Sequence, residues 1–360
     1  MRDKTFLVMA GGTGGHVFPA LATAKKLMSR NDKVVWLGSV GGMEERVVQD
    51  AGIPFYGISV SGVRGKGILS KALAPLKIAK AVFQALLVLR KTRPDAVLGM
   101  GGFASGPGGL AAKLLGKPLL VHEQNAVAGM TNKVLAKMAD SVMSAFPEAF
   151  EDASKVVLTG NPLRDEICEL FYSSKDSVSK SRPIRVLVLG GSLGAARLNE
   201  VLPGAMSSLG AEIRPEIWHQ TGRNKSEGVA ASYEKYGVKA QVSEFIDDMA
   251  AAYRWADFVI CRAGALTISE LCVAGLGAIL IPYPHAVDDH QTLNAQYMTK
   301  GGAAWLLDQQ DLSESTLSEV LAPLFSKPER ISILSEAARK LAKADATENV
   351  ASECRRVCYA

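Results

Sequence analysis

Two glycine-rich turns of this chain combine residue types and spacing that suit phosphate binding. One apolar run leads into Gly11-Gly-Thr-Gly-Gly-His16, and another leads into Gly190-Gly-Ser-Leu-Gly-Ala195. Glycine allows the backbone to approach a ligand closely, and the N–H groups at a helix N-terminus attract an anion. We therefore predict two phosphate-binding turns, each joining a strand to a helix.

A third glycine-rich turn and two polar segments add candidate ligand contacts. Gly99 to Gly109 follows another apolar run, and His122-Glu-Gln-Asn125 stands where the next run ends. The segment from Arg262 leads from a strand into a helix and places Glu270 about one turn inside it. A carboxylate there could accept two hydrogen bonds from the vicinal hydroxyls of a ribose, whereas spacing alone favours a solvated helix carboxylate.

Strands and helices must position these turns, and apolar runs alternate with helical segments along the whole chain. Apolar runs of this length indicate parallel sheets covered on both faces, which is an α/β fold class. Ligands of such sheets bind along the carboxyl edge of the strands. The predicted strands are Phe6–Ala10, Val34–Leu37, Ala96–Met100, Leu119–His122, Ser141–Ser144, Arg185–Leu189, Glu216–Gln220, Gln241–Phe245, Phe258–Cys261 and Ala278–Pro282.

The length of 360 residues favours two domains, each large enough to bury its own core. The predicted boundary is Gly160-Asn-Pro162, because proline disfavours helix in the residue before it and a polar segment soon follows. We therefore predict domains over residues 1–161 and 162–343. The helical, charged segment from Pro328 to Ala360 could pack on either domain, and its last helix, about residues 344–360, could return to the first.

The same turns lack the motifs of other nucleotide-binding classes. A dinucleotide site would need a third glycine where Val17 stands and an acidic residue where the second strand ends in Gly38-Ser39. The chain has no GxxxxGK[ST] sequence, which excludes a P-loop, and no DxD sequence, so we expect neither a bound metal nor another cofactor.

Five cysteines without a CxxC pair favour reduced thiols in a cytosolic protein. No apolar stretch reaches the roughly 18 residues of a membrane-spanning helix.

Charge is distributed unevenly, although the net charge is only +5. Residues 1–161 carry a net charge of +9, and the remaining residues carry −4. The stretch from Ala51 to Pro94 has no acidic residue and contains an apolar helical part from Leu69 to Leu89. It suits either adsorption to an anionic membrane surface or an ordinary crossover helix packed on the sheet, and it carries no motif for nucleic acid. Its cations are Arg64, Lys66, Lys71, Lys77, Lys80, Arg90, Lys91 and Arg93.

Eight segments form an ordered series of motifs from about Phe6 to beyond Asn294. They are Gly11-Gly-Thr-Gly-Gly-His-Val-Phe-Pro19, Gly62-Val-Arg-Gly-Lys-Gly67, Gly99-Met-Gly-Gly-Phe-Ala-Ser-Gly-Pro107, His122-Glu-Gln-Asn125, Gly160-Asn-Pro-Leu-Arg164, Gly190-Gly-Ser-Leu-Gly-Ala195, Glu244-Phe-Ile-Asp-Asp-Met249 and Arg262-Ala-Gly-Ala-Leu-Thr-Ile-Ser-Glu270. Together they resemble the MurG family, the N-acetylglucosaminyltransferases that convert lipid I to lipid II in bacterial peptidoglycan synthesis. One glycine-rich turn would be a weak signal, whereas eight motifs in series are specific.

The resemblance implies the GT-B architecture, in which two Rossmann-like domains with parallel sheets face each other across a cleft. The C-terminal domain would bind UDP-GlcNAc, with Ile246 presenting backbone groups to uracil and Glu270 holding the ribose. The N-terminal domain would bind the lipid-linked acceptor. The implied donor contacts are Thr13, Gly14, Gly15, Asn125, Arg164, Ser192, Ile246, Ala265, Leu266, Thr267, Ile268, Ser269, Glu270 and Gln291, and the implied acceptor-diphosphate contacts are Gly11, Gly12, Gly101, Gly102 and Ser105.

Inverting transfer needs a base for the attacking hydroxyl and stabilisation of the charge on the departing UDP. His16 is the first candidate base, because it follows the first glycine turn directly and imidazole titrates near neutral pH. Glu123 is the second candidate. Helix-end amides near Ser192 and Ala265, helped by Arg164, would stabilise the leaving group.

Some positions depart from the pattern expected of the family. Phe103 stands where relatives can carry Tyr, and Leu193 stands where they can carry Gln. Spacing around His290 leaves open whether His290 or Gln291 faces the sugar.

Three functions fit these residues. The first is a GlcNAc transferase held peripherally at the cytoplasmic face of the inner membrane. Its partners would be UDP-GlcNAc, undecaprenyl-linked lipid I, an anionic membrane surface and other cell-wall synthesis proteins. The second is a UDP-GlcNAc epimerase of the same architecture, which needs neither acceptor nor lipid surface. The third is a non-enzymatic carrier of polyprenyl diphosphates, which would need no uridine pocket.

Overall fold

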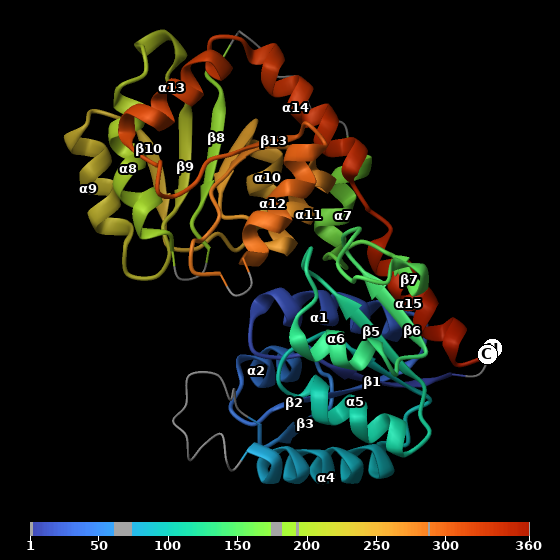
Figure 1. The fold of residues 1–360 in the computed structure, drawn as a ribbon. Helices are drawn as coiled ribbons and strands as arrows, with labels where there is room; N and C mark the ends of the chain where they lie inside the picture. The colour runs from blue at the N-terminus through green and yellow to red at the C-terminus, as the bar shows by residue number, and fades with distance from the viewer. Residues whose placement is uncertain (1–2, 61–73, 174–181, 192–193, 287–288, 360) are drawn as a thin grey trace. The chain divides into compact units, whose positions relative to one another are not determined.

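The computed structural model describes residues 3–60, 74–173, 182–191, 194–286 and 289–359 (Figure 1). The chain divides into two compact units. Unit 1 comprises residues 1–164 and 345–360, and unit 2 comprises residues 165–344. The chain therefore crosses between the units twice, after Arg164 and after Ala344.

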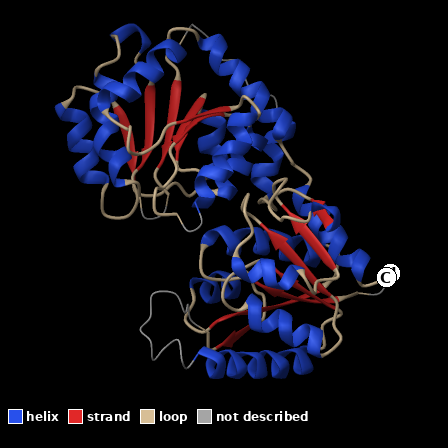
Figure 2. Cartoon of the chain, in the orientation of Figure 1, coloured by secondary structure: helices blue, strands red, loops and turns tan. Residues whose placement is uncertain are grey.

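Unit 1 is an α/β structure with helices on both faces of its sheet (Figure 2). Within the described residues this parallel sheet has seven strands in the order β3-β2-β1-β4-β5-β6-β7. The strands are β1 (Thr5–Met9), β2 (Lys33–Ser39), β3 (Phe55–Ile58), β4 (Ala96–Gly99), β5 (Leu119–Glu123), β6 (Ser141–Ser144) and β7 (Val156–Leu158). The helices are α1 (Gly14–Ser29), α2 (Met43–Asp50), α4 (Ala74–Thr92), α5 (Ser105–Leu114), α6 (Met130–Ala136) and α15 (Ala346–Val357), with a 3₁₀ turn at Ala153–Lys155.

The order of strands in unit 1 reverses at β1, which pairs with β2 on one side and β4 on the other. Residues Phe6 to Met9 of β1 are fully buried, because helices cover both faces of the strand. On one face the core includes α1 and also α15, whose Val350 and Cys354 pack in the same cluster as Leu27. The final helix is thus part of the first unit's core.

Unit 2 repeats this arrangement. Its parallel sheet, in the part of the chain that the structure describes, has six strands in the order β10-β9-β8-β11-β12-β13. The strands are β8 (Arg185–Leu189), β9 (Glu216–Gln220), β10 (Ala240–Ser243), β11 (Phe258–Cys261), β12 (Gly277–Leu280) and β13 (Ala304–Leu306). The helices are α7 (Asp165–Tyr172), α8 (Ala196–Ser207), α9 (Ser226–Lys235), α10 (Met249–Trp255), α11 (Ala265–Ala274), α12 (His290–Lys300), α13 (Glu314–Phe325) and α14 (Pro328–Leu341), with a 3₁₀ turn at Ala211–Ile213.

The predicted α/β class with two parallel sheets is confirmed, and each predicted strand overlaps an observed one. The short strands β3, β7 and β13 were not predicted. All three are strands at or near the sheet edges. The C-terminal helical segment is interrupted, because α14 ends at Leu341 and α15 begins at Ala346.

Candidate functional site

Two glycine-rich turns meet at the carboxyl edge of the sheet in unit 1, beside the point where the strand order reverses. Gly102 has a φ of +86°, and a Cβ built on it would lie 2.8 Å from the backbone N and carbonyl C of Gly11. Only glycine permits this backbone contact at such a φ. The Ser105 hydroxyl lies 3.0 Å from the Met9 carbonyl oxygen and 2.7 Å from that of Gly101, which fixes the second turn. The turns thus form one surface beside the N-terminus of α5, which suits a phosphate.

A buried carboxylate supports the first of these turns. Glu44 of α2 is fully buried and accepts hydrogen bonds from the N–H groups of Ser39 at 2.9 Å and Gly12 at 3.3 Å. A Cβ on Gly11 or Gly42 would collide with its carboxyl group. Sequence reasoning missed Glu44, because an acidic residue in the first turn of a helix is common and nothing marked this one.

His16 lies in the first turn of α1 and is half-buried against the second glycine turn. A Cβ on Gly101 would lie 2.9 Å from the imidazole Nε2, and Nδ1 lies 3.3 Å from the Gly11 carbonyl oxygen. Nδ1 is also 3.4 Å from Thr13 Oγ1. Because a carbonyl oxygen only accepts, the Gly11 contact requires the proton on Nδ1, and the lone pair of the neutral ring is then on Nε2.

Glu123, at the end of β5, is buried and saturated with hydrogen bonds. Its carboxylate accepts from the Asn125 backbone N–H at 2.9 Å, the Asn125 side-chain amide at 3.2 Å, the Gly129 N–H at 3.1 Å and the Asn132 side-chain amide at 2.8 Å. These four donors occupy the directions from which a substrate proton would arrive. Glu123 therefore holds Asn125 in position.

His122 serves the fold of unit 1. It is fully buried, and burial lowers its pKa from 6.5 to about 4. Its Nε2 donates to the Gly160 carbonyl oxygen at 2.9 Å, and its Nδ1 accepts from the Gln124 side-chain amide at 3.0 Å. The neutral ring thus fastens the end of β5 to the segment that leads out of unit 1.

The glycine-rich turn of unit 2 follows β8 and has the same construction. Gly194 has a φ of +71°, and a Cβ built on it would lie 3.0 Å from the Thr221 carbonyl carbon. Gln220 fixes the turn, because its side chain accepts from the Gly191 N–H at 3.0 Å and donates to the Glu244 carbonyl oxygen at 2.7 Å. Ser192, a predicted donor contact, lies outside the described residues, as does Leu193.

Glu270 of α11 is not the solvated carboxylate that its spacing alone favoured. Its side chain is only 8% exposed, and its Oε2 accepts a hydrogen bond from the hydroxyl of the buried Tyr253 at 2.8 Å. Tyr253 belongs to α10 and was not predicted as part of the site. The pair fixes a carboxylate one turn beyond the N-terminus of α11, where first-turn N–H groups suit a phosphate.

The other predicted donor residues differ in how exposed they are. Thr13 and Gly15 are exposed. The half-buried residues are Gly14, Asn125, Arg164, Ile246, Leu266, Thr267, Ser269 and Gln291. Ile268 is fully buried, so a ligand could meet only its backbone. Gln291 accepts from the Tyr283 N–H at 2.9 Å through its side-chain oxygen, while Arg164 is the last residue of unit 1 before the chain enters unit 2.

Among the described residues, no group of three or more His, Cys, Asp or Glu side chains is placed to hold a metal ion. No described helix is both long and apolar enough to span a membrane.

The family that the sequence matches places this chain among the glycosyltransferases. The N-terminal domain of glycosyltransferase family 28 matches residues 6–144, and the C-terminal domain of that family matches residues 185–350. The first match spans strands β1 to β6 and the second spans β8 to β13, each with a glycine-rich turn.

The chain belongs to the MurG family. It is 52% identical, over 98% of its length and 97% of the relative's, to the UDP-N-acetylglucosamine--N-acetylmuramyl-(pentapeptide) pyrophosphoryl-undecaprenol N-acetylglucosamine transferase of Marinobacter nauticus. Its identity to the protein of the same name from Hahella chejuensis is 49%, over 99% of both chains. The crystal structure of Acinetobacter baumannii MurG matches with a TM-score of 0.84 and 42% identity, covering 98% of this chain and 99% of that one.

A more distant structure shares the fold alone. A putative UDP-N-acetylglucosamine 2-epimerase from Listeria monocytogenes matches with a TM-score of 0.66 at 17% identity, covering 99% of this chain and 97% of that one. The architecture therefore serves transferases and epimerases alike, and the fold does not choose between them.

Proposed function

We propose that this chain transfers N-acetylglucosamine from UDP-GlcNAc to the MurNAc 4-hydroxyl of undecaprenyl-diphosphate-MurNAc-pentapeptide, with inversion at the anomeric carbon. The observation that carries the proposal is the 52% identity, over 98% of the chain, to a relative whose name states this donor sugar and this acceptor. Both substrates contain a diphosphate, and each unit has a glycine-rich turn of the kind that binds one.

Unit 2 is the proposed donor site. The N-terminal end of α11, which starts at Ala265, would hold the UDP diphosphate and stabilise the negative charge that grows on it as the glycosidic bond breaks. Glu270 would accept the ribose hydroxyl hydrogens, with Tyr253 holding its carboxylate in place. Ser192, Ile246 and Gln291 complete the proposed donor contacts, together with the contacts from unit 1 named above.

Unit 1 is the proposed acceptor site. The contacting turns that carry Gly12 and Gly102 would hold the acceptor diphosphate through backbone N–H groups at the N-terminus of α5. His16 Nε2 would take the proton of the attacking 4-hydroxyl while the hydroxyl oxygen forms the new bond to the anomeric carbon and UDP leaves. No metal is proposed, because helix-end amides supply the stabilisation of charge.

Transfer of radiolabelled GlcNAc to a short-chain lipid I analogue tests the reaction and the base. Wild-type protein should catalyse transfer, and His16→Ala should lower kcat by about 10²- to 10⁴-fold, the range for general-base catalysis. Lys25→Ala changes an exposed residue of the same helix and is the matched control. A pH profile that keeps its acidic limb in His16→Gln would contradict the base assignment, and no transfer by folded wild type would overturn the proposal.

Peripheral attachment to anionic membrane at the cytoplasmic face is part of the proposal, and α4 supports it. Its buried stripe, Ala81, Ala85 and Leu89, packs in the core, yet large apolar side chains remain exposed on another stripe, with Leu76 69% and Phe83 60% exposed. The exposed stripe repeats at helical spacing and includes cations. Its members are Leu76, Lys80, Phe83, Leu87, Arg90 and Lys91. Arg64, Lys66 and Lys71 of the predicted basic patch lie outside the described residues.

Sedimentation with vesicles that contain phosphatidylglycerol tests this attachment. Each cation near an anionic surface contributes about 1 kcal/mol, so reversing Lys80 and Arg90 to Glu should weaken adsorption at least tenfold at low salt. Reversing the exposed Lys235 and Lys239 of unit 2 makes the same change in net charge and serves as the control. Equal loss in both double variants would mean that net charge, not the α4 stripe, drives adsorption.

A GlcNAc epimerase or a polyprenyl diphosphate carrier would respond differently to the same reagents. An epimerase would convert UDP-GlcNAc without acceptor, and this product is detected by NMR. A carrier would bind prenyl diphosphate whether or not Glu270 is intact. We expect Glu270→Ala to weaken UDP-GlcNAc binding and to abolish transfer.

A further inference from the structure

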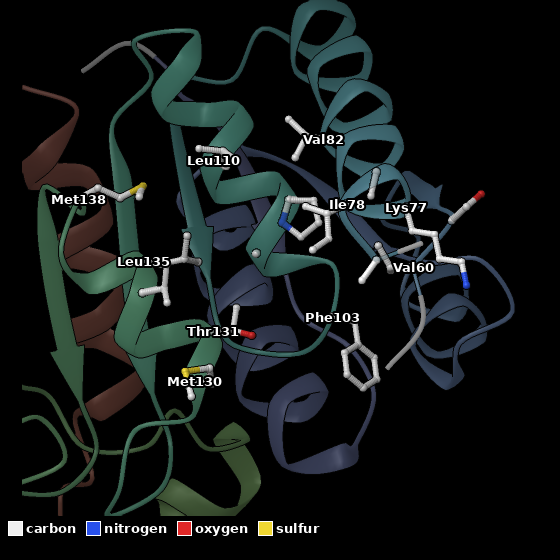
Figure 3. Close-up of a pocket in the computed structure, with 16 residues that line it drawn as sticks. Val60, Lys77, Ile78, Val82, Phe103, Leu110, Met130, Thr131, Leu135 and Met138 are labelled. Atoms are coloured by element: carbon white, nitrogen blue, oxygen red, sulfur yellow. The ribbon is translucent and has the colours of Figure 1, made fainter. Parts of the chain in front are cut away.

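An apolar pocket opens in unit 1 beside the second glycine-rich turn (Figure 3). Its volume is about 490 Å³, within the range of pockets that hold small organic ligands. Helices α4, α5 and α6 form its walls. It is lined by Ser59, Val60, Ala74, Lys77, Ile78, Ala81, Val82, Phe103, Gly106, Pro107, Leu110, Met130, Thr131, Val134, Leu135 and Met138.

The lining suits a hydrocarbon chain. Leu135 and Ala81 are fully or almost fully buried and form part of its inner wall, whereas Phe103, Met130 and Val134 remain about half exposed or more at its edge. Lys77 is the one charged side chain among the described lining residues. A polar ligand would find few partners here, while an apolar ligand would remove exposed apolar surface from water.

Glycines of α5 shape the pocket. A Cβ on Gly109 would lie 2.6 Å from Leu135 Cδ2, so the helix packs tightly on α6 at that point. One turn earlier, a Cβ on Gly106 would meet Thr131 Cγ2 at 3.6 Å, an ordinary contact distance. The absence of a side chain at Gly106 therefore leaves open space in the wall nearest the glycine turn.

The pocket is continuous with the proposed diphosphate site. Phe103 belongs to the turn that contains Gly101 and Gly102, and Gly106 is in the first turn of α5. In a polyprenyl diphosphate the hydrocarbon chain is bonded directly to an oxygen of the diphosphate. A diphosphate bound at the N-terminus of α5 therefore places the first isoprene units within reach of Phe103 and Gly106.

We propose that this pocket binds the isoprene units nearest the diphosphate of the lipid acceptor and so contributes to recognition of its chain. The inference rests on the proposed acceptor site of unit 1 and adds a subsite to it. Here the occupant is the substrate's own chain, not an acyl chain of the bilayer. Pocket residues Ile78, Ala81 and Val82 lie on the side of α4 opposite the exposed stripe that contains Phe83 and Leu87.

Chain-length dependence of the acceptor tests the proposal. The assay compares MurNAc-pentapeptide diphosphates that carry one isoprene unit or four, below their critical micelle concentrations and without bilayers. The wild-type KM should be at least about tenfold lower for the four-unit acceptor, because each buried CH₂ group of the chain adds affinity. The readout is the ratio of the two KM values, which cancels general losses of activity.

Two residues of α5 provide a matched pair of variants. Leu110 lines the pocket, and Leu114, one turn later and 63% exposed, does not. Leu110→Asn should reduce the KM ratio about fivefold, whereas Leu114→Asn should keep it within twofold of wild type. Gly106→Val, which fills the open wall, should also reduce the ratio and gives a second test if Leu110→Asn folds poorly.

The outcomes separate this proposal from the proposed function. Absence of transfer to either acceptor by wild type would refute the transferase itself. Transfer with the same KM ratio in wild type, Leu110→Asn and Gly106→Val would overturn the subsite alone. A normal KM ratio combined with weaker adsorption of Leu110→Asn to phosphatidylglycerol vesicles would show that the pocket takes a bilayer chain and would also overturn it.

Discussion

Replacing Gly102 by alanine tests the backbone contact between the two turns of unit 1. Gly102 and Gly12 have φ values of +86° and +88°. An alanine at either position adopts a conformation that costs an L residue about 1 to 2 kcal/mol. The surroundings differ, because a Cβ at 102 would lie 2.8 Å from Gly11 backbone atoms, whereas nothing lies within 4 Å of one at 12.

The difference in free energy of unfolding between Gly102→Ala and Gly12→Ala therefore measures how closely the two turns pack. Forcing extra volume into a packed site costs about 1 to 3 kcal/mol beyond the conformational term. We expect Gly12→Ala to lower the free energy of unfolding by about 1 to 2 kcal/mol and Gly102→Ala to lower it by about 2 to 5 kcal/mol. Urea unfolding at neutral pH, followed by circular dichroism without ligands, gives both values.

Equal losses in the two variants would refute the close packing of the turns. Unit 2 offers an independent repeat of the comparison. Gly191, at φ +80°, has nothing within 4 Å of its Cβ position, whereas Gly194, at φ +71°, faces the Thr221 carbonyl. Gly194→Ala should therefore cost more stability than Gly191→Ala.

Three further predictions follow from the buried groups. Tyr253→Phe removes the hydrogen bond to Glu270 and should raise KM for UDP-GlcNAc about fivefold, with kcat changed less than twofold. If Tyr253 had a purely structural role, the variant would lose thermal stability and KM would stay unchanged. Glu123→Gln replaces one acceptor oxygen with an amide donor that faces N–H groups, so it should lower the free energy of unfolding by about 2 kcal/mol. The variant should keep the acidic limb of the kcat–pH profile. Loss of that limb would make Glu123 the base. Acid should destabilise both units. Burial lowers the pKa of His122 to about 4 and that of His219 to about 3. Below pH 6.5 the unfolded chain therefore binds protons that the native chain does not bind. At pH 5 the loss should be about 2 kcal/mol per histidine, and His219→Gln should remove its share of the difference between urea unfolding at pH 7 and pH 5.

The sequence predicted the fold where burial is complete. Strand β1 is apolar from Phe6 to Met9 because helices cover both of its faces, and β11 is apolar along its whole length. The missed strands β7 and β13 have only three residues each, and they expose Val157 by 44% and Trp305 by 36%. Strands this short and only partly buried are hard to recognise at the edge of a sheet.

The site was predictable where backbone geometry demands one residue type. Gly12, Gly102 and Gly194 have positive φ values, so glycine itself marked the turns. Glu44 and Tyr253 act through hydrogen bonds to residues 32 and 17 positions away, and both occupy ordinary helix positions. No local pattern distinguishes such residues, because only the folded chain brings the partners together.

The position of α15 in the core of unit 1 has a consequence for biosynthesis. Every residue of unit 2 lies between α6 and α15 along the chain. As the chain is made, unit 2 therefore has its complete set of strands and helices before unit 1 does, although unit 1 starts first. Until α15 has been synthesised, the apolar face of α1 around Leu27 is not buried. Unit 1, which carries His16, therefore completes its fold after unit 2.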